Sequence, residues 1–516
     1  MTYPGRLRLV GAVAAVLWPV ASGVAAGAAQ RPPAGADREA PPAAVAVTNY
    51  ADATTVRHCA ALIRGTLADA SATSVVVVNE SSTRPTRRMT GLAHKGRFVA
   101  LSELVPGANT LSIQAGARKT ALTLFYRPQT NPYVIRVIYL TDNTGDTRFQ
   151  TPLKDDPQDY RGKLDTAMKL MQTFTAERLH DLGFGRVTFN LELDAEGRVA
   201  VHTLRGSLSI REYHKLEDVK WYEDACRLVR RNMGNPRAKD LVILAFTRFD
   251  AEARRSYGHT ALGGGDLAMF GGGDLFAWPD SLGEVQKAFM NAQRVDPGQF
   301  LSDSVGRHAF WAIASTTIGA ALHELGHTLD LPHCRDNMGV MSRGFDHLNR
   351  VFTLVEPPHA GRDKPCEFKE DEMACFEPAS AAWLKAGRWF ALDKRTYHDR
   401  RDTHMRFDAL SRSVVIESGN GIAAVVLGVG GEAAKNIPLH SMTPRRFLLP
   451  MSSLDKGMSV DNVTIRVMDA QGMGTAAELR NLVAEQEKAA PSAAPKPQGG
   501  VQGRALDGPG RGNLSR

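Results

Sequence analysis

After residue 29 the chain lacks any apolar run long enough to cross a bilayer. A spanning helix needs about 20 consecutive apolar residues, so we expect no stable membrane insertion of the mature protein. The one long apolar run, 9–24, follows two arginines and precedes the small residues 26–28. This order is typical of a signal peptide over residues 1–29 and predicts a secreted or periplasmic protein. An uncleaved anchor is the alternative, which Pro19 and the many small residues of the run disfavour.

A surplus of positive charge is also absent from the body of the chain. The whole chain has a formal net charge of +8. Residues 1–29 contribute +2 and the tail after Glu487 contributes +4, which leaves +2 for everything between them. A surface that binds a phosphate backbone needs a concentrated excess of lysine and arginine. We therefore expect no nucleic-acid partner.

Cysteines are few, and their number is odd. The five are Cys59, Cys226, Cys334, Cys366 and Cys375. In an oxidising compartment some of them are expected to pair, which leaves one over. One arrangement joins Cys366 to Cys375 and Cys226 to Cys334 and leaves Cys59 free, but the spacing leaves other connectivities open.

The pattern of apolar runs predicts three folded regions, preceded by a short linker and followed by a tail. Residues 30–45 are rich in proline and alanine, which predicts the linker. Short apolar or alternating runs between turn residues predict an immunoglobulin-like β-sandwich over 46–130 and a second β-sandwich over 401–486. The alanine, proline and glycine content of 487–516 predicts a disordered tail.

Strand and helix patterns alternate in the central region, residues 131–400. Residues 134–140 and 241–246 have the continuous apolar character of buried strands. Between them, apolar residues at helical spacing run through 163–182, and Gly183 ends the helix. These patterns predict a domain that combines helices with a β-sheet.

A glycine-rich segment spans residues 257–278. It is not a phosphate-binding loop, because no Gly-Lys-Ser/Thr follows, and its spacing does not match a dinucleotide-binding motif. Two interpretations stay open. The segment is either a flexible surface loop or a strand and loop at the rim of a substrate cleft.

The segment 320–333 reads AALHELGHTLDLPH and contains the residues that point to a chemical function. The run before it is free of proline from Trp311 onward, which predicts a helix. His323 and His327 then lie one turn apart on the same face and can bind one Zn²⁺. Glu324 lies beside the first ligand and is placed to act as a general base on water.

A zinc site of this kind needs a third protein ligand and an open position for water. His333 is the candidate, because Pro332 prevents the helix from continuing and the chain should turn near Asp330. Three neutral histidines leave a single catalytic ion its full charge, so it can lower the pKa of water to about 7. The purely structural alternative is a buried helix whose histidines bind no metal. Histidine and glutamate, however, seldom occupy adjacent core positions without a functional role.

Residues 323–333 resemble the zinc signature of the metzincins, HExxHxxGxxH. Met341, within NMGVMS, matches the methionine turn that metzincins place beneath the metal. The continuation 341–350 resembles more closely a little-studied family of zinc metallopeptidases, which share HELGH with a downstream MSRGF and LNR. The resemblance implies a metzincin-like zincin fold of the α+β class, zinc as cofactor, peptide-bond hydrolysis and a structural role for Met341.

The sequence departs from the metzincin pattern at two points, one in the metal loop and one after Met341. Asp330 stands where the signature has glycine, at a point where the helix ends with φ > 0. Aspartate tolerates this conformation at a cost of about 1 kcal/mol. No tyrosine follows Met341 to stabilise a transition state. Arg343 or His347 could serve, although a structural role is favoured for each.

Four other features are weaker candidates. Cys334 could ligate the metal, but a disulfide or a buried thiol is favoured. Cys59 lacks the surrounding sequence of an inhibitory zinc-binding thiol. His259 is best explained by packing or surface exposure, and the acidic run 367–372 by solvation, with calcium binding as a remote option.

The sequence thus predicts a zinc metallopeptidase that acts on a protein or peptide. The alternative is an inactive, zinc-stabilised binding or adhesion protein whose β-sandwich domains contact glycan or protein, and the presence of Glu324 argues against it. A third hypothesis keeps the zinc chemistry and assigns another amide or an ester as the substrate.

Overall fold

A computed structural model describes residues 44–440 and 442–489 of the chain. The predicted signal peptide (1–29), nearly all of the predicted linker (30–45) and the tail beyond residue 489 lie outside these ranges. Among the described helices, none combines the length and the apolar character that a membrane span requires.

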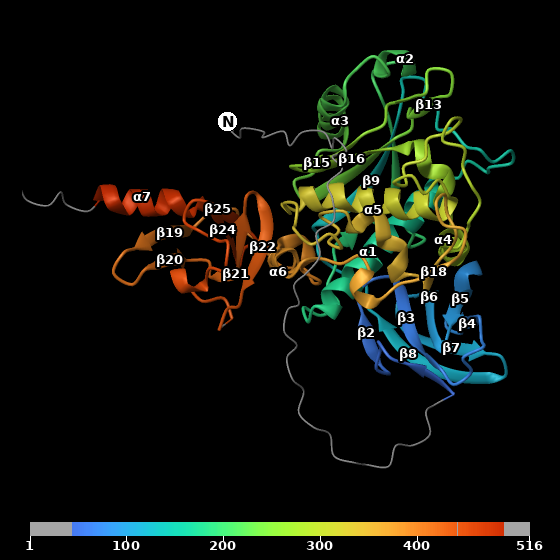
Figure 1. The fold of residues 1–516 in the computed structure, drawn as a ribbon, viewed down its shortest axis with the longest axis horizontal. Coiled ribbons are helices and arrows are strands. Elements are labelled where there is room, and N and C mark those ends of the chain that lie inside the picture. The colour runs from blue at the N-terminus through green and yellow to red at the C-terminus, as the bar shows by residue number, and fades with distance from the viewer. Residues whose placement is uncertain (1–43, 441, 490–516) are drawn as a thin grey trace, which may run out of the picture. The chain divides into compact units, whose positions relative to one another are not determined.

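The N-terminal β domain is a single eight-stranded sheet (Figure 1). Its strands are β1 (Val45–Val47), β2 (Thr54–Val56), β3 (Ala60–Leu67), β4 (Ser74–Asn79), β5 (Arg88–His94), β6 (Arg97–Glu103), β7 (Gly107–Ala115) and β8 (Arg118–Tyr126), in the order β1-β3-β6-β5-β4-β7-β8-β2. The sequence predicts two facing sheets here. One continuous sheet forms instead, because β5 pairs with both β4 and β6 and joins the two halves. The sheet curls around its own core, so that β1 also contacts β7 and β8.

The central domain is built on a mixed sheet in the order β10-β9-β12-β16-β15, with β11 also paired to β9. Its strands are β9 (Val134–Thr141), β10 (Asn190–Leu191), β11 (Val201–Arg205), β12 (Ala238–Leu244), β15 (Ala261–Gly264) and β16 (Leu267–Gly271). All of them run parallel except β15, which pairs antiparallel with β16 at the edge. The strands predicted at 134–140 and 241–246 are present.

Helices cover both faces of the central sheet. Successive side chains of a strand point to opposite sides, so alternate residues of β9 pack into two different cores. On β9, Val137 and Tyr139 share a core with α1 (Tyr160–Asp181) and α5 (Phe310–Thr328). Ile138 and Leu140 share another core with α3 (Asp218–Met233). The result is a mixed α/β domain with three layers. Helix α1 coincides with the helix predicted over 163–182, and Gly183 follows it with φ +84°.

The glycine-rich segment 257–278 forms β15, β16 and a 3-10 helix (Gly272–Ala277), so it is not a flexible loop. Gly263 explains part of its composition. A Cβ at this position would clash with the backbone carbonyl of Glu324 on α5. Glycine therefore lets the edge strand approach the helix that carries the HELGH motif. The interpretation as a rim strand agrees with this arrangement.

The C-terminal β domain contains two sheets. The first consists of β19 (Thr403–Asp408), β20 (Ser413–Ser418) and β23 (Arg446–Pro450), and the second of β22 (Glu432–Ile437), β21 (Ile422–Val429), β24 (Val463–Asp469) and β25 (Gly474–Glu478). Both sheets and α7 (Leu479–Ala489) contribute to one apolar core. On the other side of the second sheet, Val426, Ala433 and Met468 join the core of the central domain. There they meet α6 (Pro378–Ala386).

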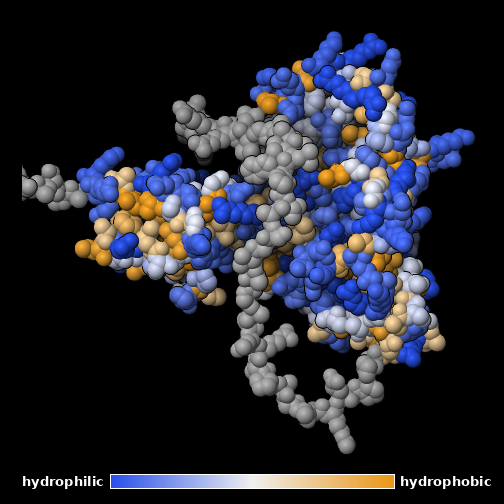
Figure 2. Space-filling view, in the orientation of Figure 1, coloured by the Kyte–Doolittle hydropathy of each residue, from blue (hydrophilic) through white to orange (hydrophobic). Residues whose placement is uncertain are grey.

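Hydrophilic side chains cover most of the face seen in Figure 2, with smaller apolar areas between them. Within the described residues, both β domains and the central domain cluster by their contacts into one unit. The contacts of each β domain with the central domain are therefore part of one continuous structure.

Candidate metal centre

Helix α5 brings His323 and His327 together on one face. Nearly all of its residues are buried, which explains why an apolar sequence without a side-chain cap forms a stable helix here. The Nε2 atoms of the two histidines lie 3.1 Å apart, and the ring centroids 4.8 Å apart.

The helix ends in a Schellman turn that redirects the chain toward the metal-binding face. The N–H of Leu331 donates to the carbonyl of Gly326 over 3.1 Å, and the N–H of Asp330 donates to that of His327 over 3.1 Å. Asp330 lies in the left-handed region with φ +61°, as predicted for the position that holds glycine in the signature. Leu331 packs over Gly326, the apolar contact that usually accompanies this turn.

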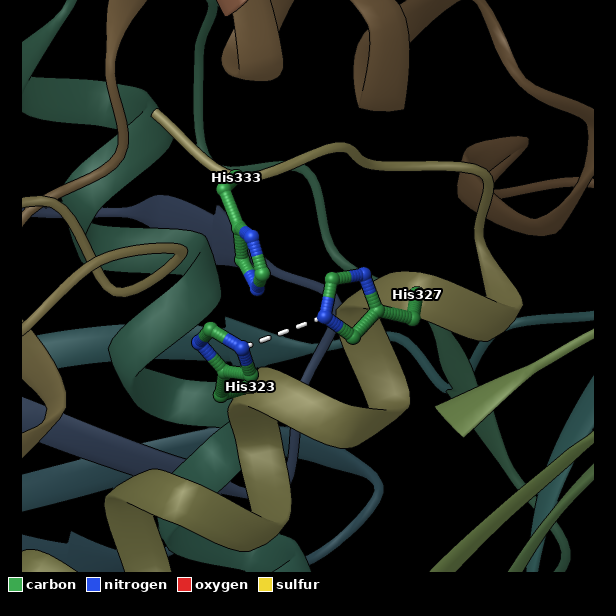
Figure 3. A group of neighbouring side chains, drawn as sticks. All are labelled: His323, His327 and His333. Carbon is green, nitrogen blue, oxygen red and sulfur yellow. Dashed lines mark hydrogen bonds between the residues drawn. The ribbon is translucent and has the colours of Figure 1, made fainter. Parts of the chain in front are cut away.

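The turn returns His333 to the other two histidines, as Figure 3 shows. Its ring centroid lies 5.2 Å from that of His323 and 5.0 Å from that of His327. One ligand atom from each of the three residues falls within 4.8 Å of the others. The structure therefore brings together all three predicted ligands.

The protonation of His323 and His327 suits metal binding. The Nδ1 atom of His323 is 2.8 Å from the carbonyl oxygen of Val340, and that of His327 is 2.9 Å from that of Leu331. Each Nδ1 can then carry the proton and donate, which leaves the Nε2 lone pair for a metal. Burial lowers the pKa of His323 to about 3 and also lowers the pKa of His327, so both stay neutral. Such a donor set fits a divalent ion of the zinc type.

Glu324 follows His323 on the same helix and is 8% exposed. Burial raises the pKa of its carboxyl group to about 8. Its backbone lies against Gly263 of the edge strand β15. Tyr222 of α3 supports the turn after this strand, because its hydroxyl is 2.7 Å from the carbonyl oxygen of Gly264. Sequence patterns alone carry no signal for that tyrosine.

Met341 lies beneath the histidines, in the turn that the sequence suggests. Its side chain is 1% exposed, and its sulfur occupies the space that a Cβ on Gly326 would need. The residue before it supplies the carbonyl that accepts from His323. Met341 thus supports the helix between the two histidines through packing.

Arg343 and His347 are both engaged in structural contacts. Arg343 forms an ion pair with Asp346 over 2.7 Å and lies over the ring of Phe345. His347 lies 3.7 Å from Glu356. These contacts agree with the structural role that the sequence favours for each.

The five cysteines are free thiols, and neither of the disulfides suggested from the sequence is formed. The thiols of Cys334 and Cys375 both lie 3.6 Å from oxygens of Asp336. Cys334 is not part of the histidine group. Cys59 is buried in the core of the N-terminal β domain, where burial raises its pKa to about 11.

Two further candidates also lie apart from the histidine group. His259 packs edge-on against Phe270 and lies 3.6 Å from Asp303. The acidic run 367–372 is mostly exposed, as solvated charges usually are.

Comparison with known proteins identifies similar sequences. A family model described as "Putative peptidase family" matches residues 44–429. A Schizosaccharomyces pombe protein named "Putative zinc metalloproteinase" is 29% identical over 280 residues, which cover 50% of this chain and 45% of the relative. A Saccharomyces cerevisiae protein with the same description is 26% identical over 303 residues, which cover 51% and 43%. The chain therefore spans less than half the length of these two relatives.

Among solved structures, catalytically inactive OgpA from Akkermansia muciniphila in complex with an O-glycopeptide is similar at 15% identity. The alignment covers 68% of this chain and 92% of OgpA, with a TM-score of 0.43.

Proposed function

Because the chain belongs to the peptidase family whose model matches residues 44–429, we propose that it is a secreted or periplasmic zinc-dependent metallopeptidase. The observation that carries this proposal is the convergence of His323, His327 and His333 beside Glu324. The signal-peptide pattern of residues 1–29 supports the location.

In this proposal the three imidazoles hold one zinc ion through nitrogen atoms that face a common point. When bound, zinc polarises a substrate carbonyl and lowers the pKa of water to about 7. Burial alone raises the pKa of Glu324, and the positive charge of a bound zinc ion would favour its carboxylate form. In that form Glu324 would accept the proton of the attacking water and then deliver it to the leaving amine. At 8% exposure, the side chain of Glu324 is largely shielded from bulk solvent.

The edge of the central sheet supports a peptide as the substrate. β15 is the terminal strand of the order β10-β9-β12-β16-β15, so the backbone groups on its outer side do not pair with another strand of that sheet. An extended peptide can add to such an edge through main-chain hydrogen bonds. Because Gly263 lies against the backbone of Glu324, a peptide on this edge would pass close to the helix that carries the proposed base.

Glu324→Gln tests the proposed role directly. Removing a general base is expected to lower peptide hydrolysis by about 10²–10⁴-fold, while zinc content and melting temperature stay unchanged. Glu223→Gln is a matched control, because that side chain is 60% exposed and belongs to α3. Hydrolysis is measured on a peptide library with mass-spectrometric detection of the products.

Chelation separates the peptidase from the inactive binding protein. Removal of zinc is expected to abolish hydrolysis and also to lower the melting temperature, because the metal binds only the folded state. A zinc-loaded protein that cleaves no peptide, together with a Glu324→Gln variant that behaves identically, would contradict the proposed activity.

A further inference from the structure

His333 is held differently from the other two histidines. His323 and His327 are fixed by α5 and by hydrogen bonds from Nδ1 to backbone carbonyls. Within residues 44–440 and 442–489, no hydrogen bond to the His333 ring is found, and the residue lies on a loop. Its position must therefore be set by the backbone on either side of it.

The edge of the C-terminal β domain holds that backbone directly. The N–H of Ala433 on β22 donates to the carbonyl of His333 over 2.7 Å. The neighbouring Cys334 forms a parallel bridge with Ala433. β22 is the terminal strand of its sheet, so its outer side is available for this pairing. The metal loop thus adds to the edge of a sheet that belongs to another domain.

Arg466 on β24 holds the same loop at its beginning. A guanidinium nitrogen donates to the carbonyl oxygen of Asp330 over 2.6 Å. Asp330 is the left-handed residue that ends α5, where the last carbonyl groups carry partial negative charge. The guanidinium lies 4.1 Å from the ring centroid of Trp383 on α6, which fixes its direction.

We propose that Arg466 and the β22 edge at Ala433 are positioning elements for the third metal ligand, so that the C-terminal β domain sets the affinity for zinc. This inference rests on the proposed function, since it assumes that the three histidines bind zinc. The family match ends at residue 429, before both positioning residues. The affinity of the metal site therefore depends on a part of the chain that the family match does not include.

The expected effect follows from preorganisation. Without Arg466, part of the free energy of zinc binding must order the loop from Asp330 to His333. Loss of a group that orients a metal ligand typically weakens metal affinity by about 10–100-fold. The helix ligands His323 and His327 keep their own contacts, so the site should be weakened but not abolished.

The experiment compares full-length wild type with Arg466→Ala, Arg466→Lys and Arg446→Ala. Arg446→Ala is the matched control, because Arg446 is 61% exposed in the same domain and only forms a surface ion pair with Glu417. The zinc dissociation constant is measured by competition with a chromophoric chelator. Far-UV circular dichroism confirms the fold of each variant.

We expect about 10–100-fold weaker zinc binding for Arg466→Ala, an intermediate value for Arg466→Lys and no change for Arg446→Ala. Lysine keeps a charge near Asp330 but loses the planar stack on Trp383, so it also provides a milder variant if alanine prevents folding. The visible spectrum of the cobalt-substituted protein adds a readout of ligand geometry. In Arg466→Ala it should shift toward the spectrum of His333→Ala without reaching it, because His333 is retained but less well ordered.

Wild-type zinc affinity and an unchanged cobalt spectrum in the folded Arg466 variants would overturn this inference and leave the proposed function standing. A wild-type protein that binds no zinc would overturn both.

Discussion

The N-terminal and C-terminal β domains contact the central domain through different groups and at different places. The N-terminal domain packs on α1 through buried charged side chains. The C-terminal domain packs on α6 and pairs its backbone with the loop that carries His333. Domains of the same general class can therefore contribute differently to one protein. The contacts predict that the first supports folding and the second supports the metal centre.

Glu177 of α1 is central to the N-terminal contact. Its side chain is fully buried and accepts hydrogen bonds from the hydroxyl of Tyr50 over 2.8 Å and from Arg186 over 2.7 Å. Lys169 precedes Glu177 on α1 by about two helical turns. It forms an ion pair with Glu103 of β6 over 3.2 Å. These contacts join the domain to the helix and do not include the metal loop.

The largest expected effect on stability comes from Glu177→Ala. It leaves the guanidinium of Arg186 and the hydroxyl of Tyr50 without their buried partner, so the free energy of unfolding should fall by about 3–5 kcal/mol. Zinc affinity of the folded protein should not change. Urea unfolding and zinc titration measure the two quantities.

Glu223→Ala is the control for this substitution, since its ion pair with Lys220 is exposed to solvent and should contribute little to stability. If Glu177→Ala weakened zinc binding as much as Arg466→Ala, the proposed division between the two β domains would be wrong.

Mild acid should weaken the N-terminal contact through His58. This residue is 1% exposed, and burial lowers its pKa to about 4 from an ordinary value of 6.5. As the pH falls from 6.5 to 4, the unfolded chain binds a proton that the folded chain does not. The free energy of unfolding should therefore decrease by about 3 kcal/mol over this window.

Urea unfolding at several pH values tests this prediction. His58→Phe should flatten the dependence, whereas His404→Phe, at an 80% exposed position, should preserve it. Glu177 contributes to the pH dependence of stability in a different pH range. Although burial opposes it, Arg186 holds the pKa of Glu177 below its ordinary value, so its contribution is lost only in stronger acid. An unchanged slope in His58→Phe would contradict the assignment.

Asp330→Gly should have the smallest effect and sharpens the account of the C-terminal contact. Glycine removes the cost of about 1 kcal/mol for a left-handed aspartate but adds flexibility to the unfolded chain, so the net change should stay within that amount. Zinc affinity should be retained, because Arg466 binds the carbonyl of Asp330, which glycine also provides. Weaker zinc binding in Asp330→Gly would show that the carboxylate holds Arg466 instead.

Local patterns predicted the elements that local physics controls. The apolar run of β9, the helical stripe of α1 and the helix around HELGH are all present, and Asp330 adopts the expected left-handed conformation. The resemblance to a family of zinc metallopeptidases is confirmed by the family match.

Features that depend on contacts between distant residues were not predictable. If β5 paired with only one neighbour, the N-terminal domain would have two sheets. Because β5 pairs with both β4 and β6, it has one, and the sequence of β5 gives no signal for this second pairing. Neither suggested disulfide is formed. The short sequence distance between Cys366 and Cys375 does not place their thiols together, and no sequence pattern specified the pairing of Cys226 with Cys334. Arg466 alternates with apolar residues in its strand, so it has the pattern of a solvent-facing arginine. Its contact with Asp330, 136 positions earlier, becomes visible only in three dimensions.

Gly263 constrains the spacing between the edge strand β15 and helix α5 in this protein. With only a hydrogen atom between the edge strand and the backbone of Glu324, the strand and the helix keep a fixed separation. Any larger side chain at this position would have to push the strand and the helix apart. In the proposed binding mode, the distance between a peptide on the strand and Glu324 would then change. The separation between β15 and α5 is therefore not free to change at this point.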